Sequence, residues 1–251
     1  MFCEITTAMK DYLPLDSFGA EGAADYDDTL RGDEPHTVAL LAELAGGGPA
    51  LELAIGTGRI ALPLAARGVR VDGVDLSPEM VAQLRAKPGG ADLRVVIGDI
   101  ADTVIEGEYA LVYLVYNTLF NLLTQDQQVR CFQSAAERLG DDGVFVVEGF
   151  TPGYLHRLRD DQYVDAERIE AGRVKLDVGR HDPVAQLLDE SHIHLSGQGV
   201  RLFPVVCRYA WPSELDLMAR LAGLRLKQRW GGWQRQPFTA DSRNCVSVYG
   251  R

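Results

Sequence analysis

The sequence predicts an α/β fold: a doubly wound, seven-stranded, mostly parallel sheet that carries an antiparallel β insertion. Three observations support this prediction. Short apolar runs alternate with helical patterns as far as residue 150, as in sheets with helices on both faces. A glycine-containing loop follows the first apolar run. After residue 150 the helical period disappears over four successive strand-like runs.

The first half of the chain supplies a preamble and five strands. Residues 12–31 are polar and contain glycine, and a helix is expected over 35–44, ended by three glycines at 46–48. The Gly-Asp-Asp-Gly turn at 140–143 marks the start of the fifth strand. Strands are expected at about 50–55, 70–75, 93–97, 109–115 and 143–149, and helices at about 59–67, 78–86 and 125–139.

The second half predicts an antiparallel meander and then a return to the main sheet. The meander is expected to have strands at about 163–170, 173–180, 184–195 and 200–210. A helix from 211 to about 222 and paired strands at 224–230 and 244–250 complete the seven strands. The predicted division is an N-terminal helical cap or lid (1–45), a main domain (46–158 with 211–251) and an antiparallel insertion (159–210).

The loop after the first strand is the strongest functional signal. Gly56 and Gly58 let the backbone turn tightly against a ligand at the carboxyl end of a strand, where nucleotide-like groups bind in such folds. Three acids accompany the loop. Glu52 lies inside the first strand, and Asp75 and Asp99 follow the next two apolar runs.

These motifs resemble those of the S-adenosylmethionine-dependent methyltransferases of the Rossmann-like class. The resemblance comprises an acid-x-x-x-Gly-x-Gly pattern at 52–58, an acid at Asp75 and Gly-Asp at 98–99, and it covers roughly residues 45–150. It implies S-adenosyl-L-methionine as the cofactor and S-adenosyl-L-homocysteine as its product. The insertion resembles that of small-molecule enzymes such as amino-sugar N-methyltransferases, where it roofs the acceptor site and often joins two subunits.

Each acid has a physical reason to contact the cofactor. Asp75 can accept hydrogen bonds from both ribose hydroxyls, and Asp99 can accept from the adenine amine, with Ile100 and Leu76 packing on the base. Glu52 is expected to be a buried carboxylate, which needs a hydrogen-bond partner. The resemblance implies that it organises the glycine loop near the methionine amino group of the cofactor. Simple helix capping is the competing interpretation of Asp75. The cofactor-binding set is Tyr26, Glu52, Ala54, Gly56, Gly58, Asp75, Leu76, Asp99, Ile100 and Tyr116.

The acceptor side carries no motif, so its candidates come from residue type and position. Methyl transfer from a sulfonium is an in-line displacement that needs aligned reactants and excluded water, which favours aromatic walls. The acceptor-binding candidates are Tyr12, Asn117, Phe120 and Trp233, with Phe18, Tyr154, Trp211, Trp230 and Phe238 as further wall residues. An amine acceptor needs only a neutral, oriented nitrogen, whereas a hydroxyl acceptor needs a base, most often histidine. His156, His192 and His194 are the candidate bases, and a structural role is the alternative for each.

The predicted function is methyl transfer to an N or O atom of a small molecule. Gly56-x-Gly58-x-x-Ala61 also fits an NAD(P)-dependent oxidoreductase, which we retain as an alternative beside a catalytically silent cofactor-binding or dimerisation module. A net charge of −11 and a pI near 4.9 disfavour nucleic acid. Four scattered cysteines, including Cys3, predict reduced thiols and no metal site. We expect a cytoplasmic protein without a membrane span, and an exposed strand edge in the insertion favours a homodimer.

Overall fold

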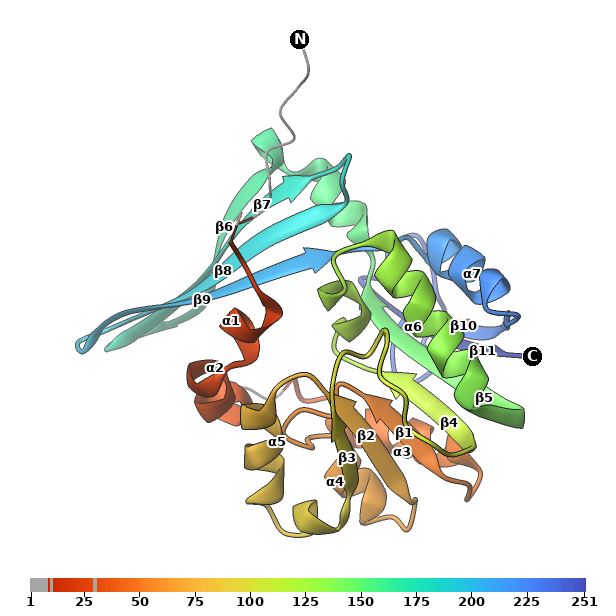
Figure 1. The fold of residues 1–251 in the computed structure, drawn as a ribbon. Helices are drawn as coiled ribbons and strands as arrows, with labels where there is room; N and C mark the ends of the chain where they lie inside the picture. Colours follow the sequence, from red (N-terminus) through yellow and green to blue (C-terminus); the bar gives the residue numbers. More distant parts are fainter. Residues whose placement is uncertain (1–8, 10, 29–30) are drawn as a thin grey trace.

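The computed structural model describes residue 9, residues 11–28 and residues 31–251, so Cys3 lies outside the described part. Two sheets organise these residues (Figure 1). One is the central layer of an α/β domain, and the other is a twisted antiparallel sheet that projects away from it. Within the described ranges, no helix is long and apolar enough to cross a membrane.

The main sheet has seven strands in the order β10-β11-β5-β4-β1-β2-β3. Strands β1 to β5 run parallel, whereas β11 is antiparallel to both β5 and β10. The fold prediction is therefore confirmed. The strands are β1 (Ala50–Leu53), β2 (Val71–Asp75), β3 (Arg94–Ile97), β4 (Tyr109–Leu114), β5 (Leu139–Phe150), β10 (Arg225–Trp230) and β11 (Asn244–Gly250).

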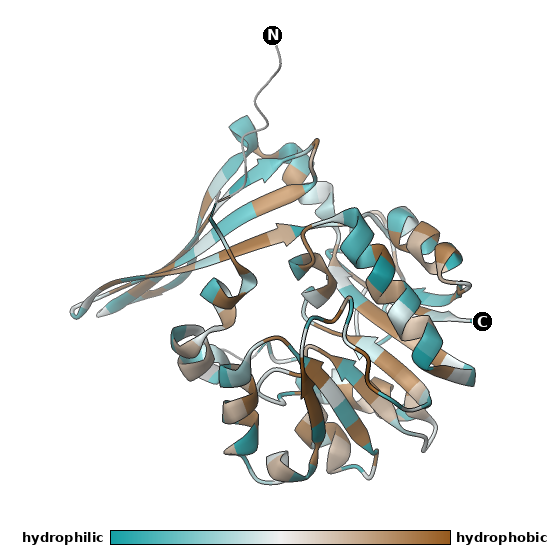
Figure 2. Cartoon of the chain, viewed as in Figure 1, coloured by the Kyte–Doolittle hydropathy of each residue, from teal (hydrophilic) through white to brown (hydrophobic). Residues whose placement is uncertain are grey.

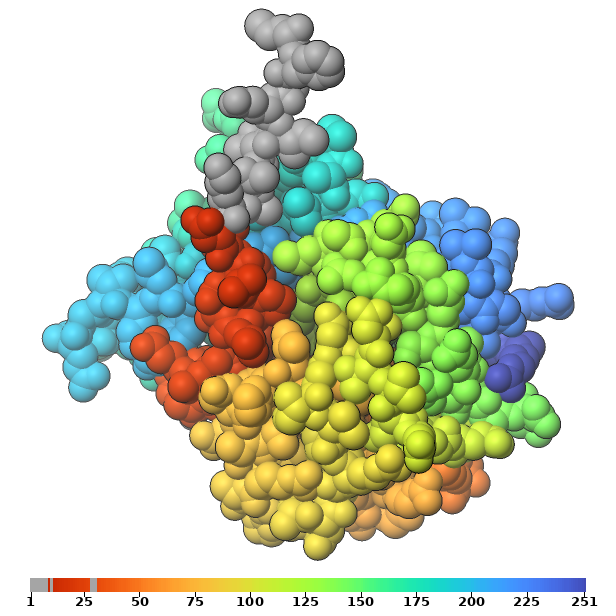
Figure 3. Space-filling view, in the orientation of Figure 1, coloured from red at the N-terminus to blue at the C-terminus, as the bar shows by residue number. Residues whose placement is uncertain are grey.

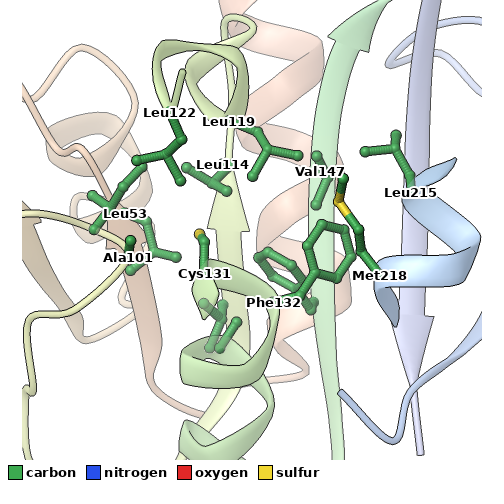
Figure 4. Packing of buried hydrophobic residues seen from close by; sticks show 14 of the residues in the cluster. Leu53, Ala101, Leu114, Leu119, Leu122, Cys131, Phe132, Val147, Leu215 and Met218 are labelled. Atoms are coloured by element: carbon green, nitrogen blue, oxygen red, sulfur yellow. The ribbon is translucent and has the colours of Figure 1, made fainter. Parts of the chain in front are cut away.

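Helices cover both faces of this sheet, and each face has its own apolar core. One core joins the strands to α6 (Gln125–Arg138) and α7 (Pro212–Leu221), with Phe132 and Met218 at its centre (Figure 4). The other joins them to α3 (Glu34–Ala45), α4 (Ala61–Ala65) and α5 (Pro78–Arg85). Figure 2 shows the matching pattern: brown residues concentrate in the strands, and α6 is largely teal where it faces solvent.

Local sequence explains where these helices begin and end. Ser77 accepts a hydrogen bond from the Met80 amide and so caps α5, and Thr124 forms a capping box with Gln127 at the start of α6. Gly46 ends α3 with a left-handed φ of 55°, which glycine adopts without a steric penalty.

The start of β5 differs from the prediction. The turn at 140–143 was expected to precede the strand, but β5 already begins at Leu139, which pairs with Tyr109. The next pair is Leu111 with Val144, so residues 140–143 bulge out of the ladder between two paired positions. The predicted strand boundary was therefore wrong.

The insertion is a four-stranded antiparallel sheet in the order β6-β7-β8-β9. Its strands are β6 (Gln162–Glu170), β7 (Arg173–Asp182), β8 (Leu187–Ser196) and β9 (Gly199–Arg208). Because side chains alternate along each strand, the register gives the sheet two different faces. One carries Glu190, His192 and their neighbours across the ladder, and the other carries aliphatic residues.

A short helical segment connects the two sheets in space. We call residues 14–28 the strap; it consists of α1 (Pro14–Phe18), α2 (Ala20–Asp25) and the 3₁₀ turn η1 (Tyr26–Asp28). In the space-filling view it lies between the insertion and the main domain (Figure 3). The Ser17 hydroxyl donates to the Pro204 carbonyl on β9 (2.5 Å), and Ser77 donates to the Phe18 carbonyl (2.6 Å).

Candidate active site

A cavity of about 540 Å³ lies where the carboxyl ends of the parallel strands meet the strap and the insertion. Ten of the residues predicted to bind cofactor or acceptor, or to act as a base, line it. They are Tyr26, Ala54, Gly56, Asp75, Leu76, Asp99, Ile100, Tyr116, Asn117 and His192. These residues come from four strand ends and from the strap and insertion, so only the tertiary fold brings them together.

The glycine loop forms one wall of the cavity. Gly56 and Gly58 have φ values of 55° and 78°, which side-chain-bearing residues rarely adopt. A Cβ on Gly58 would lie 2.3 Å from Leu84 Cδ1, so this glycine is required by packing as well. Ala54 has a φ of 62° although it is not glycine. Such strained backbone concentrates at functional sites.

Asp75 is held rigidly at the end of β2. Its two carboxylate oxygens accept hydrogen bonds from the Gly56 amide (2.6 Å) and the Ser77 amide (2.8 Å). Burial raises the pKa of this carboxyl, and the two amides oppose that rise. Asp99 accepts from the Ala101 amide (2.8 Å), which likewise fixes its orientation.

Glu52 lies behind the glycine loop and is not on the cavity lining. It is 3% exposed, and the Tyr113 hydroxyl donates to it at 3.0 Å. Burial raises the pKa of Glu52 to about 8, and the neighbouring charge of Asp75 adds to the rise. Gly58 also does not line the cavity, and a Cβ there would meet Leu84 and Leu62.

Tyr116 is fixed by charged groups on every side. Its hydroxyl donates to Glu34 (2.7 Å), and its amide donates to Glu148 (2.8 Å). The guanidinium carbons of Arg31 and Arg59 lie 4.1 and 3.7 Å from its ring centroid, a cation–π geometry.

Asn117, the next residue, also has a positive φ, of 59°. Its side-chain oxygen accepts from the Phe150 amide (2.7 Å), so it ties β5 to the loop after β4.

Of the three histidines proposed as bases, only His192 lines the cavity. Its Nδ1 lies 3.5 Å from Asp177 Oδ1. His156 instead meets the Tyr209 hydroxyl (3.2 Å) and packs on Trp211. The ring of His194 packs on Phe203, with centroids 4.7 Å apart.

Three acceptor-binding candidates are also absent from the cavity lining, for packing reasons. Phe120 is buried against the Gly149 backbone, where a Cβ would meet its ring at 2.7 Å. Trp233 is 5% exposed and belongs to the core between the sheet and α3. Tyr12 shares a hydrogen bond with Ser17 (2.7 Å) beside the strap. Trp211, Trp230 and Phe238 do not line the cavity either, whereas Phe18 and Tyr154 do.

Several lining residues were not predicted, and Glu190 and Cys207 are the most informative chemically. A signal for Glu190 was present, because it precedes His192 by two residues on a strand and therefore shares its face. Cys207 carries no such signal. The lining also includes Asn121, Leu122 and Leu123 from the segment that leads into α6, and Gln127 from the first turn of α6.

The charge of the cavity distinguishes between nucleotide ligands. Three carboxylates line it, from Asp75, Asp99 and Glu190, and the described lining residues include no lysine or arginine. A pyrophosphate would meet three carboxylates and no lysine or arginine among the described lining residues, whereas a positively charged sulfonium with a ribose and an adenine fits both the charge and the glycine cradle. Fold and cavity thus define the Rossmann-like class that binds S-adenosylmethionine.

Comparisons with known proteins give the family. Residues 50–143 match the family described as methyltransferase domain. The structure of the CcbJ methyltransferase from Streptomyces caelestis is similar, with 40% identity, a TM-score of 0.87, and coverage of 93% of this chain and 97% of that chain. The cypemycin N-terminal methyltransferase of a Streptomyces species is 26% identical over 205 residues, 82% of this chain and 84% of that protein.

The chain belongs to the methyltransferase family and is an S-adenosylmethionine-dependent methyltransferase. An amino pentose methyltransferase from Micromonospora echinaspora, solved with this cofactor bound, shares the fold at 22% identity, with a TM-score of 0.63 and coverage of 92% and 91%. The comparisons support neither the oxidoreductase nor the silent module.

Proposed function

We propose that this enzyme transfers a methyl group to a nitrogen or oxygen atom of a small-molecule acceptor. The observation that carries the proposal is the arrangement of Glu52, Asp75 and Asp99 around one glycine loop, at the edge of a cavity that continues under the insertion. The name of the cypemycin N-terminal methyltransferase places methylation at an N-terminus in that relative, which favours nitrogen here.

We assign the cofactor half of the cavity to the main domain. Asp75 would accept from the ribose hydroxyls and Asp99 from the adenine amine, with Leu76 and Ile100 packing on the base. Glu52 would hold the loop from behind, while Tyr26 and Tyr116 would close the methionine end. S-adenosylmethionine supplies an electrophilic methyl group on a sulfonium.

We assign the acceptor half to the insertion, the strap and the loop after β4. Asn117, Phe18 and Tyr154 would form its walls and exclude water. His192 is the imidazole that would contact the acceptor and serve as base for a hydroxyl, with Asp177 behind it at 3.5 Å. His156 and His194 do not line the cavity and have no role in this assignment.

We also propose a homodimer formed through the face of the insertion that is turned away from the cavity. Aliphatic residues from all four strands lie on this face by register, and several are largely exposed. The exposed fractions are 69% for Val164, 75% for Ile169, 63% for Val200 and 61% for Leu202. A contiguous apolar face of this kind is typical of a protein contact.

A cytoplasmic location remains part of the proposal. Cys131, Cys207 and Cys245 are free thiols in the structure, as expected in a reducing compartment.

Calorimetric titration with S-adenosylmethionine and with NAD tests the cofactor assignment, and we expect binding of the sulfonium alone. Incubation with radiolabelled S-adenosylmethionine and a metabolite extract then tests transfer, with label expected in a small organic product. Label that appears only in protein or nucleic acid would contradict the proposal, as would NAD binding without sulfonium binding.

A further inference from the structure

Among the described residues that line the cavity, Glu190 is the one carboxylate that the cofactor assignment does not use. Asp75 and Asp99 lie at strand ends of the main sheet, whereas Glu190 lies on β8 in the insertion, beside His192. It therefore belongs to the half of the cavity assigned to the acceptor. Glu190 is half-buried, and removing a carboxylate from water is costly unless it is paired or hydrogen-bonded.

The partners of Glu190 within the chain are acids and hydroxyls. The Tyr163 hydroxyl donates to it at short range and also reaches Asp177 (3.4 Å). Gly179 leaves room for the Tyr163 ring in this position. A Cβ at residue 179 would lie only 2.2 Å from a ring carbon of Tyr163. Burial raises the pKa of Glu190 to about 7, and the nearby Asp177 adds to the rise.

No cation of the insertion neutralises this group. Lys175 pairs with Glu167 (2.9 Å), Arg180 with Asp189 (2.7 Å) and Arg201 with Asp25 (2.6 Å). In the part of the chain that the structure describes, no lysine or arginine forms an ion pair with Glu190. The site is thus a half-buried acidic group with hydroxyl support and an open side toward the cavity.

A cationic amine is the ligand that completes such a site. Simple alkyl amines resemble lysine, with a pKa of about 10, and arrive protonated at neutral pH. An ammonium has no lone pair and cannot accept a methyl group. Before transfer it must lose a proton, and a carboxylate beside it in an apolar cavity can both bind it and take that proton.

We propose that Glu190 binds the ammonium group of the acceptor and removes its proton. The N–H bond breaks with its electron pair left on nitrogen, and the proton bonds to a carboxylate oxygen of Glu190. Tyr163 stays protonated throughout, because burial and Glu190 raise its pKa far above the ordinary value. This inference rests on the proposed function and narrows its acceptor to an amine.

The test compares two probes of equal size, cyclohexylamine and cyclohexanol, by ligand-observed NMR titration with S-adenosylhomocysteine present. We expect the wild type at pH 8.5 to bind the amine at least about fivefold more tightly, roughly 1 kcal/mol. Glu190→Gln should bring the two affinities within twofold. Glu170→Gln, the same change at an exposed position of the same sheet, should keep the preference.

The pH dependence of the amine preference gives a second measurement, which the wild type alone can provide. Because the pKa of Glu190 is raised to about 7, the carboxyl carries less charge at pH 5.5 than at pH 8.5 while the amine keeps its own, so the wild-type preference should fall. The groups that face Glu190 are Tyr154, Tyr163, Asp177, His192 and Cys207. A preference that changes with pH equally in Glu190→Gln would assign the effect to Asp177 or His192 and overturn the proposal.

The outcomes separate the two proposals. Wild type that fails to bind S-adenosylhomocysteine would contradict the proposed function itself. Wild type and both variants that bind it equally, with no wild-type preference for the amine, would refute only the role of Glu190. A preference retained in Glu190→Gln would refute it as well.

Discussion

Environment gives the carboxylates in and behind the cavity wall different properties although they share one functional group. Asp75 is held by two backbone amides, which compensate for part of its burial. Glu52 has a single tyrosine donor and keeps its proton to a much higher pH. Glu190 has a tyrosine donor and a neighbouring acid. Each residue therefore supports a separate prediction about binding or protonation.

Asp75→Ala should weaken the binding of S-adenosylmethionine at least tenfold, about 1.4 kcal/mol, because the ribose would lose a fixed, charged acceptor. Calorimetric titration measures the dissociation constant. Asp241→Ala, on an exposed loop, is the control and should bind normally. An unchanged constant in a folded Asp75→Ala protein would disprove the ribose assignment.

Glu52 should make the ligand-free protein less stable as pH rises. Its folded pKa of about 8 lies above the unfolded value of 4.5, so the folded state holds the extra proton between these values and loses that advantage toward pH 8. Glu52→Gln should remove this loss, so its stability relative to wild type should rise by on the order of 4 kcal/mol from pH 5 to pH 9.

Urea unfolding at pH 5, 7 and 9 measures the effect on both proteins, and their stability difference is the quantity to compare. Parallel pH profiles for the two proteins would show that Glu52 titrates normally.

At the scale of elements, the strap is held from two sides. Asp25 pairs with Arg201 of the insertion (2.6 Å), while Asp27 accepts from Thr57 of the glycine loop (2.7 Å) and pairs with Lys87 (2.5 Å). The strap is short, and Ala23 is its main buried apolar residue. Polar contacts therefore account for much of its attachment, and such segments open at low cost.

Asp27→Ala should release the strap from the glycine loop and speed cofactor dissociation several-fold, with less effect on association. Stopped-flow displacement of S-adenosylhomocysteine measures both rates. Glu21→Ala, exposed on α2, serves as the control because the change is similar and the tether stays intact. Equal dissociation rates in the two variants would show that this tether does not hold the strap closed.

At the scale of the whole molecule, the two faces of the insertion differ in composition. The face toward the cavity carries Glu190, His192 and Asp177, and the opposite face carries an aliphatic surface. A sheet that projects from its domain as in Figure 1 has little of its own core to cover this surface. A second copy of the chain would bury it and stiffen the roof of the site.

Ile169→Lys combined with Leu202→Lys should convert the dimer to a monomer, because two charges on each copy would be buried without partners. Light scattering after size-exclusion chromatography measures the mass. Val184→Lys, at a position 93% exposed in the turn between β7 and β8, should leave the dimer intact. A wild-type monomer at tens of micromolar would refute the homodimer.

The sequence by itself determined the order and type of the elements. Periodicity located the main strands within a few residues, and glycines with acids at strand ends identified the cofactor side, because these signals are local. The start of β5 was missed because pairing with β4, rather than turn chemistry, decides where a strand begins.

Only the tertiary structure decided which side chains share the cavity. Tryptophan and phenylalanine suit a ligand wall and a core equally, and packing assigned Phe120 and Trp233 to the core. His192 and His194 share one face of β8 by register, yet only His192, which lies farther from the turn between β8 and β9, lines the cavity. Glu190 gains its importance from Tyr163 and Asp177, which are distant in sequence, and long-range proximity of this kind exists only in the folded chain.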